Sequence, residues 1–319
     1  MENLIWIVSP EGDSITTWKT DIQSVLENEE LLKKSPKWIH LRGMDEQVEN
    51  FLLKNFKINE LSLEDCRSEG RSKVEVFEDY VFVLMIYFDG GISRQKKLCI
   101  FWGKDFIITI GSRRLFEETR KNLSLEERPF EQGVERIFWL ISSIVADKFK
   151  GVTDILEEQA DEIEARVFKE QNPELLEDIS DLSFEILTLR RTLKQLRDTY
   201  KSLISSVSRF INPENIHYFR DLLDEISILY DRAETLHEFT QNVLSVFSSL
   251  VSFKLNDIMK TLTILITILE PLMLISSFYG MNIEELPFAH SPYGIFVISF
   301  LMIGISFFLL YYFRRKGWI

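Results

Sequence analysis

The stretch from Asn256 to Asn282 reads NDIMKTLTILITILEPLMLISSFYGMN, and it decides the fold of this chain. It is apolar enough to enter a bilayer, although it carries Glu270 near its middle. A second apolar run, residues 293–313, follows after a short polar loop. A membrane-spanning helix needs about 20 apolar residues, so the two runs predict a helical hairpin whose first span covers about 258–280 and whose second covers 293–313.

The charges around the two runs predict how the hairpin is oriented. Five cations lie near the ends of the two runs that are away from the connecting loop: Lys254, Lys260, Arg314, Arg315 and Lys316. The loop itself carries Glu284 and Glu285. Because Lys and Arg are retained on the cytoplasmic side, we expect a multi-pass protein of the cell (inner) membrane with both termini in the cytoplasm. Glu284 and Glu285 are then expected in an external loop.

The part of the chain ahead of the hairpin is acidic. The 319 residues include 37 basic and 50 acidic side chains, a net charge of −13, whereas the charges from Asn256 onward balance. An acidic cytoplasmic part repels nucleic acid and attracts cations. Many soluble surfaces are acidic as well, so charge excludes a nucleic-acid partner but does not establish a metal function.

The sequence holds no common enzyme motif. It contains no Walker loop, GxGxxG, HExxH or CxxC, and its four histidines are scattered: His40, His217, His237 and His290. Neither a catalytic triad nor a zinc site built from His and Cys is expected, so the protein is not predicted to be an enzyme. Cys66 and Cys99 are expected to be reduced core or surface residues, because cytoplasmic thiols rarely form disulfides.

Residues 1–130 predict an α/β domain. Short runs rich in β-branched and aromatic residues predict six strands: 4–8, 38–41, 73–77, 80–88, 98–102 and 106–110. Residues 17–32 and 45–55 have the apolar spacing of helices. Glycine-containing turns at 90–91 and 103–105 predict hairpins, so we expect the later strands to be antiparallel neighbours.

Residues 131–255 predict a helical stalk. Apolar side chains at 182–207 alternate steps of four and three residues, the period of helices packed along their length. Asn172-Pro173 and Asn212-Pro213 are each typical of a helix start, with Asn as the cap and Pro in the first turn.

One uninterrupted helix is expected to join the stalk to the membrane. No Gly or Pro occurs between Glu214 and Pro271, which predicts a helix on the order of 100 Å long. A lone helix of that length is unstable, and this chain is too small to cover it. We therefore expect several copies to gather these helices around an axis. A coiled-coil spacer that holds a membrane-anchored domain is the simpler alternative.

Tyr279-Gly280-Met281-Asn282 closes the first span. This YGMN sequence, between two terminal spans and ahead of a basic tail, resembles the CorA family of divalent-cation channels. The resemblance implies an α+β membrane protein with a cytoplasmic α/β domain (1–130), a long helical stalk (131–255) that continues into the first span, and a transmembrane hairpin (256–319). It also implies a homopentameric funnel that conducts Mg²⁺.

Other positions extend the resemblance, and one departs from it. Residues 218–221 (YFRD), together with Asn256 and Met259, stand where the family has similar residues on its long helix. Glu270 occupies a pore-line position where the family usually has an apolar residue, often Met. A carboxylate facing lipid is costly, so we expect Glu270 to face a pore or a partner helix, or to be neutral.

One stripe of the first span is predicted to line the pore. Its members recur every three or four residues: Asn256, Met259, Leu262, Ile266, Glu270, Met273 and Ser277. Met259, Leu262 and Ile266 would form an apolar constriction that gates by dewetting.

The pore mouth is predicted at the YGMN sequence. Mg²⁺ holds its waters tightly and prefers oxygen ligands, so a site can select it by binding the hydrated ion. The Asn282 amide and the backbone carbonyls of Gly280 and Met281 would accept hydrogen bonds from those waters, with Tyr279 as a brace. Gly280 allows the backbone to bend where the helix ends.

Three functions are compatible with these features. The first is a Mg²⁺ influx channel, with Co²⁺ and Ni²⁺ as further candidate ions. The second is a zinc transporter resembling the ZntB branch, in which Glu270 takes part in proton coupling; the intact Met281 argues against it. The third is a non-conducting membrane-anchored cation sensor.

A regulatory site is implied by the resemblance. In CorA-like proteins the residue matching Asp221 pairs with an acidic residue of the adjacent subunit to hold a regulatory Mg²⁺, and here Asp89 is the candidate partner. Two facing carboxylates repel unless a cation lies between them. Cytoplasmic Mg²⁺ would therefore clamp the subunits around a closed gate. The alternative is that both residues are ordinary solvated surface acids.

Overall fold

The computed structural model describes residues 4–27, 32, 35–68, 70–170, 172–206, 210–281, 286–287 and 291–318. The chain divides into two compact units. The first comprises Met1–Arg166 and Asn172–Val243 and holds a β-sheet with its helices. The second comprises Val167–Gln171 and Leu244–Ile319 and holds the most apolar helical segments.

One seven-stranded sheet forms the centre of the first unit. Its strands are β1 (Leu4–Glu11), β2 (Ser14–Asp21), β3 (Lys37–Leu41), β4 (Lys73–Val76), β5 (Tyr80–Phe88), β6 (Gln95–Gly103) and β7 (Phe106–Ile110). Across the sheet the order is β2-β1-β3-β7-β6-β5-β4, and only β3 and β7 pair in parallel. The predicted antiparallel pairing of the later strands is therefore confirmed.

The helix predicted at 17–32 is wrong in its first part. Residues Ser14–Asp21 form β2, which pairs with β1 along its whole length. Gly12, with a φ of 62°, closes the tight turn between the two strands in a conformation that suits glycine. The β-branched residues of this stretch favour extended backbone. Ile22–Glu27 then form a short helix, α1, and residues 28–31 of the predicted helix lie outside the described residues.

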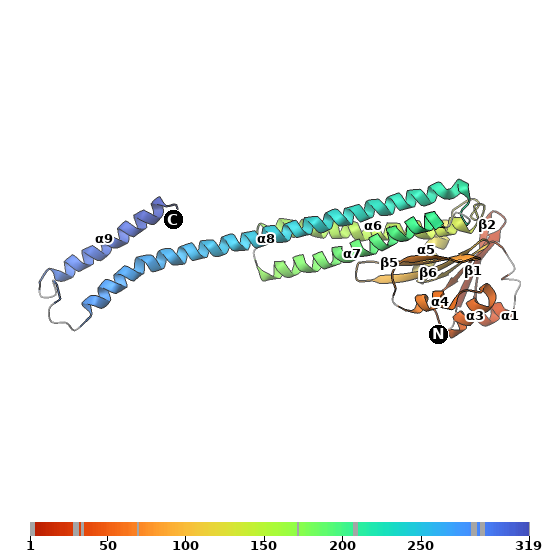
Figure 1. Ribbon diagram of the computed structural model, residues 1–319, viewed down its shortest axis with the longest axis horizontal. Coiled ribbons are helices and arrows are strands. Elements are labelled where there is room, and N and C mark those ends of the chain that lie inside the picture. The colour runs from red at the N-terminus through yellow and green to blue at the C-terminus, as the bar shows by residue number, and fades with distance from the viewer. Residues whose placement is uncertain are drawn as a thin grey trace. The chain divides into compact units, whose positions relative to one another are not determined.

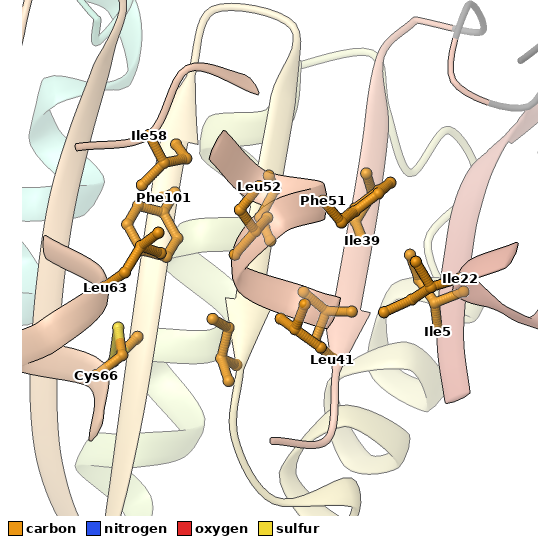
Figure 2. Close-up of a cluster of buried hydrophobic side chains, with 14 of the residues drawn as sticks. Ile5, Ile22, Ile39, Leu41, Phe51, Leu52, Ile58, Leu63, Cys66 and Phe101 are labelled. Atoms are coloured by element: carbon orange, nitrogen blue, oxygen red, sulfur yellow. A yellow bond between two sulfur atoms is a disulfide. The ribbon is translucent and has the colours of Figure 1, made fainter. Parts of the chain in front are cut away.

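Helices α3 (Glu46–Phe56) and α4 (Glu60–Arg67) cover one face of the sheet (Figure 2). Phe51 and Leu63 of these helices belong to a buried apolar cluster that also contains side chains of β1, β3, β5, β6 and β7. The helix predicted at 45–55 is confirmed as α3. It starts after Asp45, whose carboxylate caps the helix by accepting the Val48 N–H at 2.9 Å.

Cys66 of α4 and Cys99 of β6 form a disulfide, with their Cα atoms 6.1 Å apart. The prediction that both thiols are unpaired is therefore wrong. The two residues lie 33 positions apart in the sequence. Only the packing of α4 against β6 brings their Cα atoms within the range that a disulfide spans.

Four helices build the other side of the first unit: α5 (Arg113–Ser124), α6 (Val134–Val167), α7 (Pro173–Ser206) and the first part of α8 (Ile216–Tyr279). Aromatic contacts fix them to the sheet. Phe138 of α6 stacks on Trp102 of β6 with ring centroids 4.8 Å apart, and Phe219 of α8 stacks on the same indole at 5.9 Å. Figure 1 shows α6, α7 and the first part of α8 running along one another.

The predicted helix starts are confirmed. Leu175 N donates to Asn172 Oδ1 at 3.0 Å at the start of α7. Glu214 N donates to Asn212 Oδ1 at 3.2 Å, where a single 3₁₀ turn, η1 (Pro213–Asn215), precedes α8. Helix α8 then runs without a break through the stalk and the first predicted span, as the sequence predicts.

Ion pairs connect the long helices within the first unit. Arg232 of α8 donates to Glu157 and to Asp154 of α6, each at 2.6 Å. These two carboxylates raise the pKa of the Arg232 guanidinium. Pairs this close to the surface stabilise a protein by about 1 kcal/mol or less, so the buried aromatic contacts dominate the packing of the stalk.

Candidate functional site

Helices α8 and α9 (Gly294–Arg315) are long and apolar enough to cross a membrane. In Figure 1, α9 runs antiparallel to the last part of α8. Their large apolar side chains are exposed, for example Met273 at 69% and Phe300 at 79%. A continuous apolar surface of this kind marks a lipid or protein contact, which agrees with the predicted transmembrane hairpin.

Each membrane helix has one partly shielded stripe. Between residues 256 and 281 of α8, the shielded side chains are Ile264, Thr267, Ile268, Pro271, Leu272, Ile275 and Tyr279. Among residues 291–318 they are Gly294, Ile298, Met302, Ile305, Ser306, Leu309 and Phe313. Both sets recur every three or four residues, as expected when two helices pack against each other. The shielded stripe of α8 is therefore the face that α9 covers.

The predicted pore-lining residues lie on a different face of α8. All seven are exposed: Asn256, Met259, Leu262, Ile266, Glu270, Met273 and Ser277. At about 100° per residue, this stripe and the shielded stripe point to roughly opposite sides of the helix. The single chain therefore leaves the predicted pore face uncovered, available to water or to further copies of α8.

Glu270 is exposed, whereas the next residue, Pro271, belongs to the stripe that α9 shields. Within the described part of the chain, no hydrogen bond or ion pair engages the Glu270 carboxylate. Neither α9 nor the rest of the described chain therefore holds this group, and the predicted contact with a partner helix stays a prediction. A pore or another copy of the chain remains as its surroundings.

The end of α8 carries the first part of the predicted mouth. Gly280 N donates to Ser276 O at 3.0 Å, which ends the helix. A Cβ atom on Gly280 would lie only 3.3 Å from the same carbonyl oxygen, so glycine fits this close turn. Tyr279 is half-buried and Met281 is exposed. Asn282, Glu284 and Glu285 lie outside the described residues, so the mouth amide and the external loop stay predictions.

Asp89, one half of the predicted regulatory pair, is already charge-compensated within its own chain. Its side chain is 12% exposed and lies 3.3 Å from Lys148 Nζ and 3.5 Å from Arg114 Nη1. Lys148 also contacts Glu118 at 3.1 Å. No local sequence pattern predicts these partners, because they come from α5 and α6, far along the chain from β5.

Asp221 is exposed on α8 and belongs to an acidic group that sequence reasoning missed. Burial, and then the nearby charges of Asp147 and Asp221, raise the pKa of Glu225, whereas Lys150 lowers it. Asp147 of α6 and Asp221 of α8 therefore each lie within electrostatic range of Glu225. Among the residues that the structure describes, no three His, Cys, Asp or Glu side chains come together as a metal site.

The family model described as CorA-like Mg²⁺ transporter protein matches residues 33–315. The cobalt/magnesium transport protein CorA of Thermotoga maritima is 29% identical over 315 residues, which cover 94% of this chain and 88% of that protein.

Two solved structures share the fold. The complete structure of the CorA magnesium transporter from Methanocaldococcus jannaschii matches with a TM-score of 0.82 at 24% identity, covering 100% of both chains. The ZntB cytoplasmic domain from Vibrio parahaemolyticus matches with a TM-score of 0.65 at 13% identity, covering 79% of this chain and 99% of that chain. The predicted order of α/β domain, long helix and two terminal apolar helices is thus confirmed.

Proposed function

The chain belongs to the CorA family of Mg²⁺ transporters, and from this membership we propose that it is a channel for Mg²⁺ influx. The observation that carries the proposal is the family match over residues 33–315, which includes both membrane helices. We include Co²⁺ as a candidate ion, since the Thermotoga relative is named a cobalt/magnesium transport protein, and we keep Ni²⁺ as a further candidate from the sequence resemblance. A membrane potential contributes roughly 4–5 kcal/mol per 100 mV to the entry of a divalent ion, so the channel needs no nucleotide and is not an enzyme.

Assembly around an axis completes the proposed pathway. The exposed stripe of α8 from Asn256 to Ser277 points away from the face that α9 covers. In a homopentamer five such stripes would enclose a pore, with α9 toward the lipid. Met259, Leu262 and Ile266 would then form the apolar gate, which closes when water leaves it. Both termini would lie in the cytoplasm of the cell (inner) membrane.

The mouth would select a hydrated ion. The carbonyls of Gly280 and Met281 and the amide of Asn282 are neutral acceptors, and five copies would offer them to the waters of Mg²⁺. Neutral groups hold a divalent ion less tightly than carboxylates do, which allows fast release. Glu284 and Glu285 would raise the local cation concentration outside the mouth.

Glu270 would add a charged ring inside the pore. Its exposure opposite the shielded stripe supports a position facing the axis. Ionised carboxylates there would attract a divalent ion between the apolar gate and the mouth. The same residue supports the second candidate, a ZntB-like zinc transporter, because a carboxylate in the pore could couple ion entry to protons.

A cytoplasmic Mg²⁺ clamp between Asp221 and the Asp89 of an adjacent subunit remains our proposal for regulation. Asp89 already contacts Lys148 and Arg114, so an ion there would have to compete with two cations. Asp221→Asn tests the clamp without disturbing those pairs, and it should weaken Mg²⁺ protection of the cytoplasmic part against proteolysis. Unchanged protection at the same Mg²⁺ concentration would show that Asp221 holds no regulatory ion.

The proposed function is tested by ion flux into liposomes that carry the purified full-length protein. With an inside-negative potential, we expect Mg²⁺ entry that grows with the potential, together with Co²⁺ and Ni²⁺ entry. Zinc entry that requires a proton gradient, without Mg²⁺ entry, would identify the ZntB-like alternative. The absence of flux for every ion, from a protein that binds Mg²⁺, would identify a sensor.

A further inference from the structure

A cavity of about 430 Å³ opens at the end of the sheet where β3 and β7 finish and β6 begins. Three stretches of backbone line it: residues 42–44 after β3, residues 111–113 after β7, and residues 96–97 at the start of β6. The disulfide between Cys66 and Cys99 completes the lining. The volume lies in the range of small-molecule sites, about 300–1,000 Å³.

Positive charge dominates this cavity. Four of its lining residues are cations, namely Arg42, Lys96, Lys97 and Arg113, and none of its lining residues is Asp or Glu. The whole chain has the opposite balance, with 50 acidic and 37 basic residues. Four cations line this cavity and no Asp or Glu does, in a protein that is acidic overall, and this favours an anionic ligand.

The four cations differ in how firmly they are held. Lys97 Nζ donates to the carbonyl oxygens of Asp65 at 3.1 Å and Ser68 at 2.7 Å, and burial lowers its pKa. Arg113 lies 3.5 Å from Glu117 on the next turn of α5. Arg42 and Lys96 are exposed, and no described residue forms an ion pair with either. Their charges are therefore available to a ligand.

The topology of the sheet places the cavity where open α/β sheets bind ligands. β3 and β7 are the parallel pair, and their carboxyl ends lie side by side. After β3 the chain enters α3, whose Phe51 packs on the face that carries Ile39. After β7 it enters α5, whose Phe116 packs on the opposite face against Trp38, at 4.9 Å. A crevice between two strands whose helices leave to opposite faces is the usual binding position.

The N-terminus of α5 opens into the same cavity. Ser112 caps this helix by accepting the Leu115 N–H at 3.3 Å. The N–H groups of the first turn have no carbonyl partner within the helix, and the helix dipole adds a partial positive charge there. A Cβ atom on Gly111 would lie 2.9 Å from Leu98 Cδ1, so glycine lets the turn pass close to β6.

From this geometry we propose that the cavity binds a small organic phosphate of nucleotide size. The phosphate would lie against the first turn of α5, between Arg42 and Lys96. Met44, Ile110 and the disulfide provide an apolar wall for the organic part. Binding here does not depend on ion conduction, so the proposal stands apart from the channel function.

The test is titration calorimetry on the full-length protein in detergent. The potassium salts of AMP, ADP and inorganic phosphate are titrated in EDTA, so that nucleotides cannot act by removing Mg²⁺. The test variant is Arg42→Gln/Lys96→Gln. The control variant is Lys19→Gln/Lys104→Gln, which removes two exposed charges from the same unit, on β2 and in the turn at the opposite end of β6.

We expect the wild type and the control to bind AMP or ADP equally well, and more tightly than inorganic phosphate. The test variant should bind about tenfold or more weakly, because two charge-assisted contacts are lost. The proposal is overturned if the wild type binds none of the three compounds. It is overturned as well if both double variants weaken binding equally, or if inorganic phosphate binds as tightly as the nucleotides.

Discussion

The two units use their apolar side chains in opposite ways. In the first unit, Phe101, Trp102 and Phe138 are at most 1% exposed. In the membrane helices, Met273 and Phe300 stay 69% and 79% exposed. A single chain therefore completes the core of the first unit, whereas the apolar helices α8 and α9 leave large side chains uncovered, available to lipid or to further copies. Mutations should consequently affect folding in the first unit and conduction in the second.

The largest effect is expected at the mouth. Asn282→Ala removes the amide proposed to bind the water shell of the ion, so Mg²⁺ entry into liposomes should fall to the background of protein-free vesicles. Assembly should be unchanged, because no apolar contact is removed, and size-exclusion chromatography checks this. Entry at the wild-type rate in an assembled variant would show that the mouth selects the ion without this amide.

A large stability effect is expected in the first unit. Phe138→Ala removes a buried ring that stacks on Trp102, and it should lower the free energy of unfolding by about 3–5 kcal/mol. Phe184→Ala is the matched control, because this ring is 70% exposed on α7, and it should change stability by about 0.5 kcal/mol or less. Urea unfolding in detergent, followed by tryptophan fluorescence, measures both. Equal losses would contradict a core completed by one chain.

A smaller effect on stability is expected from His40. Burial lowers its pKa to about 3, and its neighbours are the neutral Trp6, Thr109 and Phe116. Between about pH 6.5 and pH 3 the unfolded chain binds a proton at this residue that the folded chain does not. Stability should therefore fall as the pH falls through this window, by roughly 2 kcal/mol at pH 5 relative to pH 7.

His40→Leu removes this titration and serves as the comparison. The same urea experiment at pH 7 and pH 5 should show a smaller loss of stability in the variant than in the wild type. The same loss in both proteins would mean that His40 is not the source of the acid sensitivity.

The smallest effect is expected at Glu270. Glu270→Gln keeps an oxygen acceptor but removes the charge, so Mg²⁺ flux should fall by less than about tenfold, or 1.4 kcal/mol. Because the variant has no ionisable group at this position, the pH dependence of its flux should differ from that of the wild type. Identical flux of both proteins at pH 6 and pH 8 would favour a buried, neutral Glu270.

Local patterns explain which parts of the fold could be predicted. Asn172 and Asn212 cap their helices within three residues, and the absence of Gly and Pro before Pro271 predicts one continuous α8. The period of the first span also predicts the stripe through Leu262 and Glu270, although only the position of α9 shows that this stripe is left uncovered.

Contacts between distant parts of the sequence explain what could not be predicted. Cys66 meets Cys99 because α4 packs on β6, and Asp89 meets Lys148 because β5 ends near α6. The cationic cavity depends on the parallel pairing of β3 and β7, which no short pattern reveals. β2 was missed for a different reason: its apolar spacing fits a helix as well as a strand until its pairing with β1 is known.

We propose that the face of α8 opposite α9 lines the ion path. Cysteine accessibility in liposomes tests it directly, with single cysteines at Leu262, Ile266 and Met273 on that face. Matched cysteines at Ile264, Ile268 and Ile275 probe the face that α9 shields. The native Cys66 and Cys99 are buried in a disulfide and should not react. A charged, water-soluble thiol reagent should block Mg²⁺ flux in the first set and leave the second set unaffected. Block confined to the second set, or equal in both, would show that the face of α8 opposite α9 does not line the ion path.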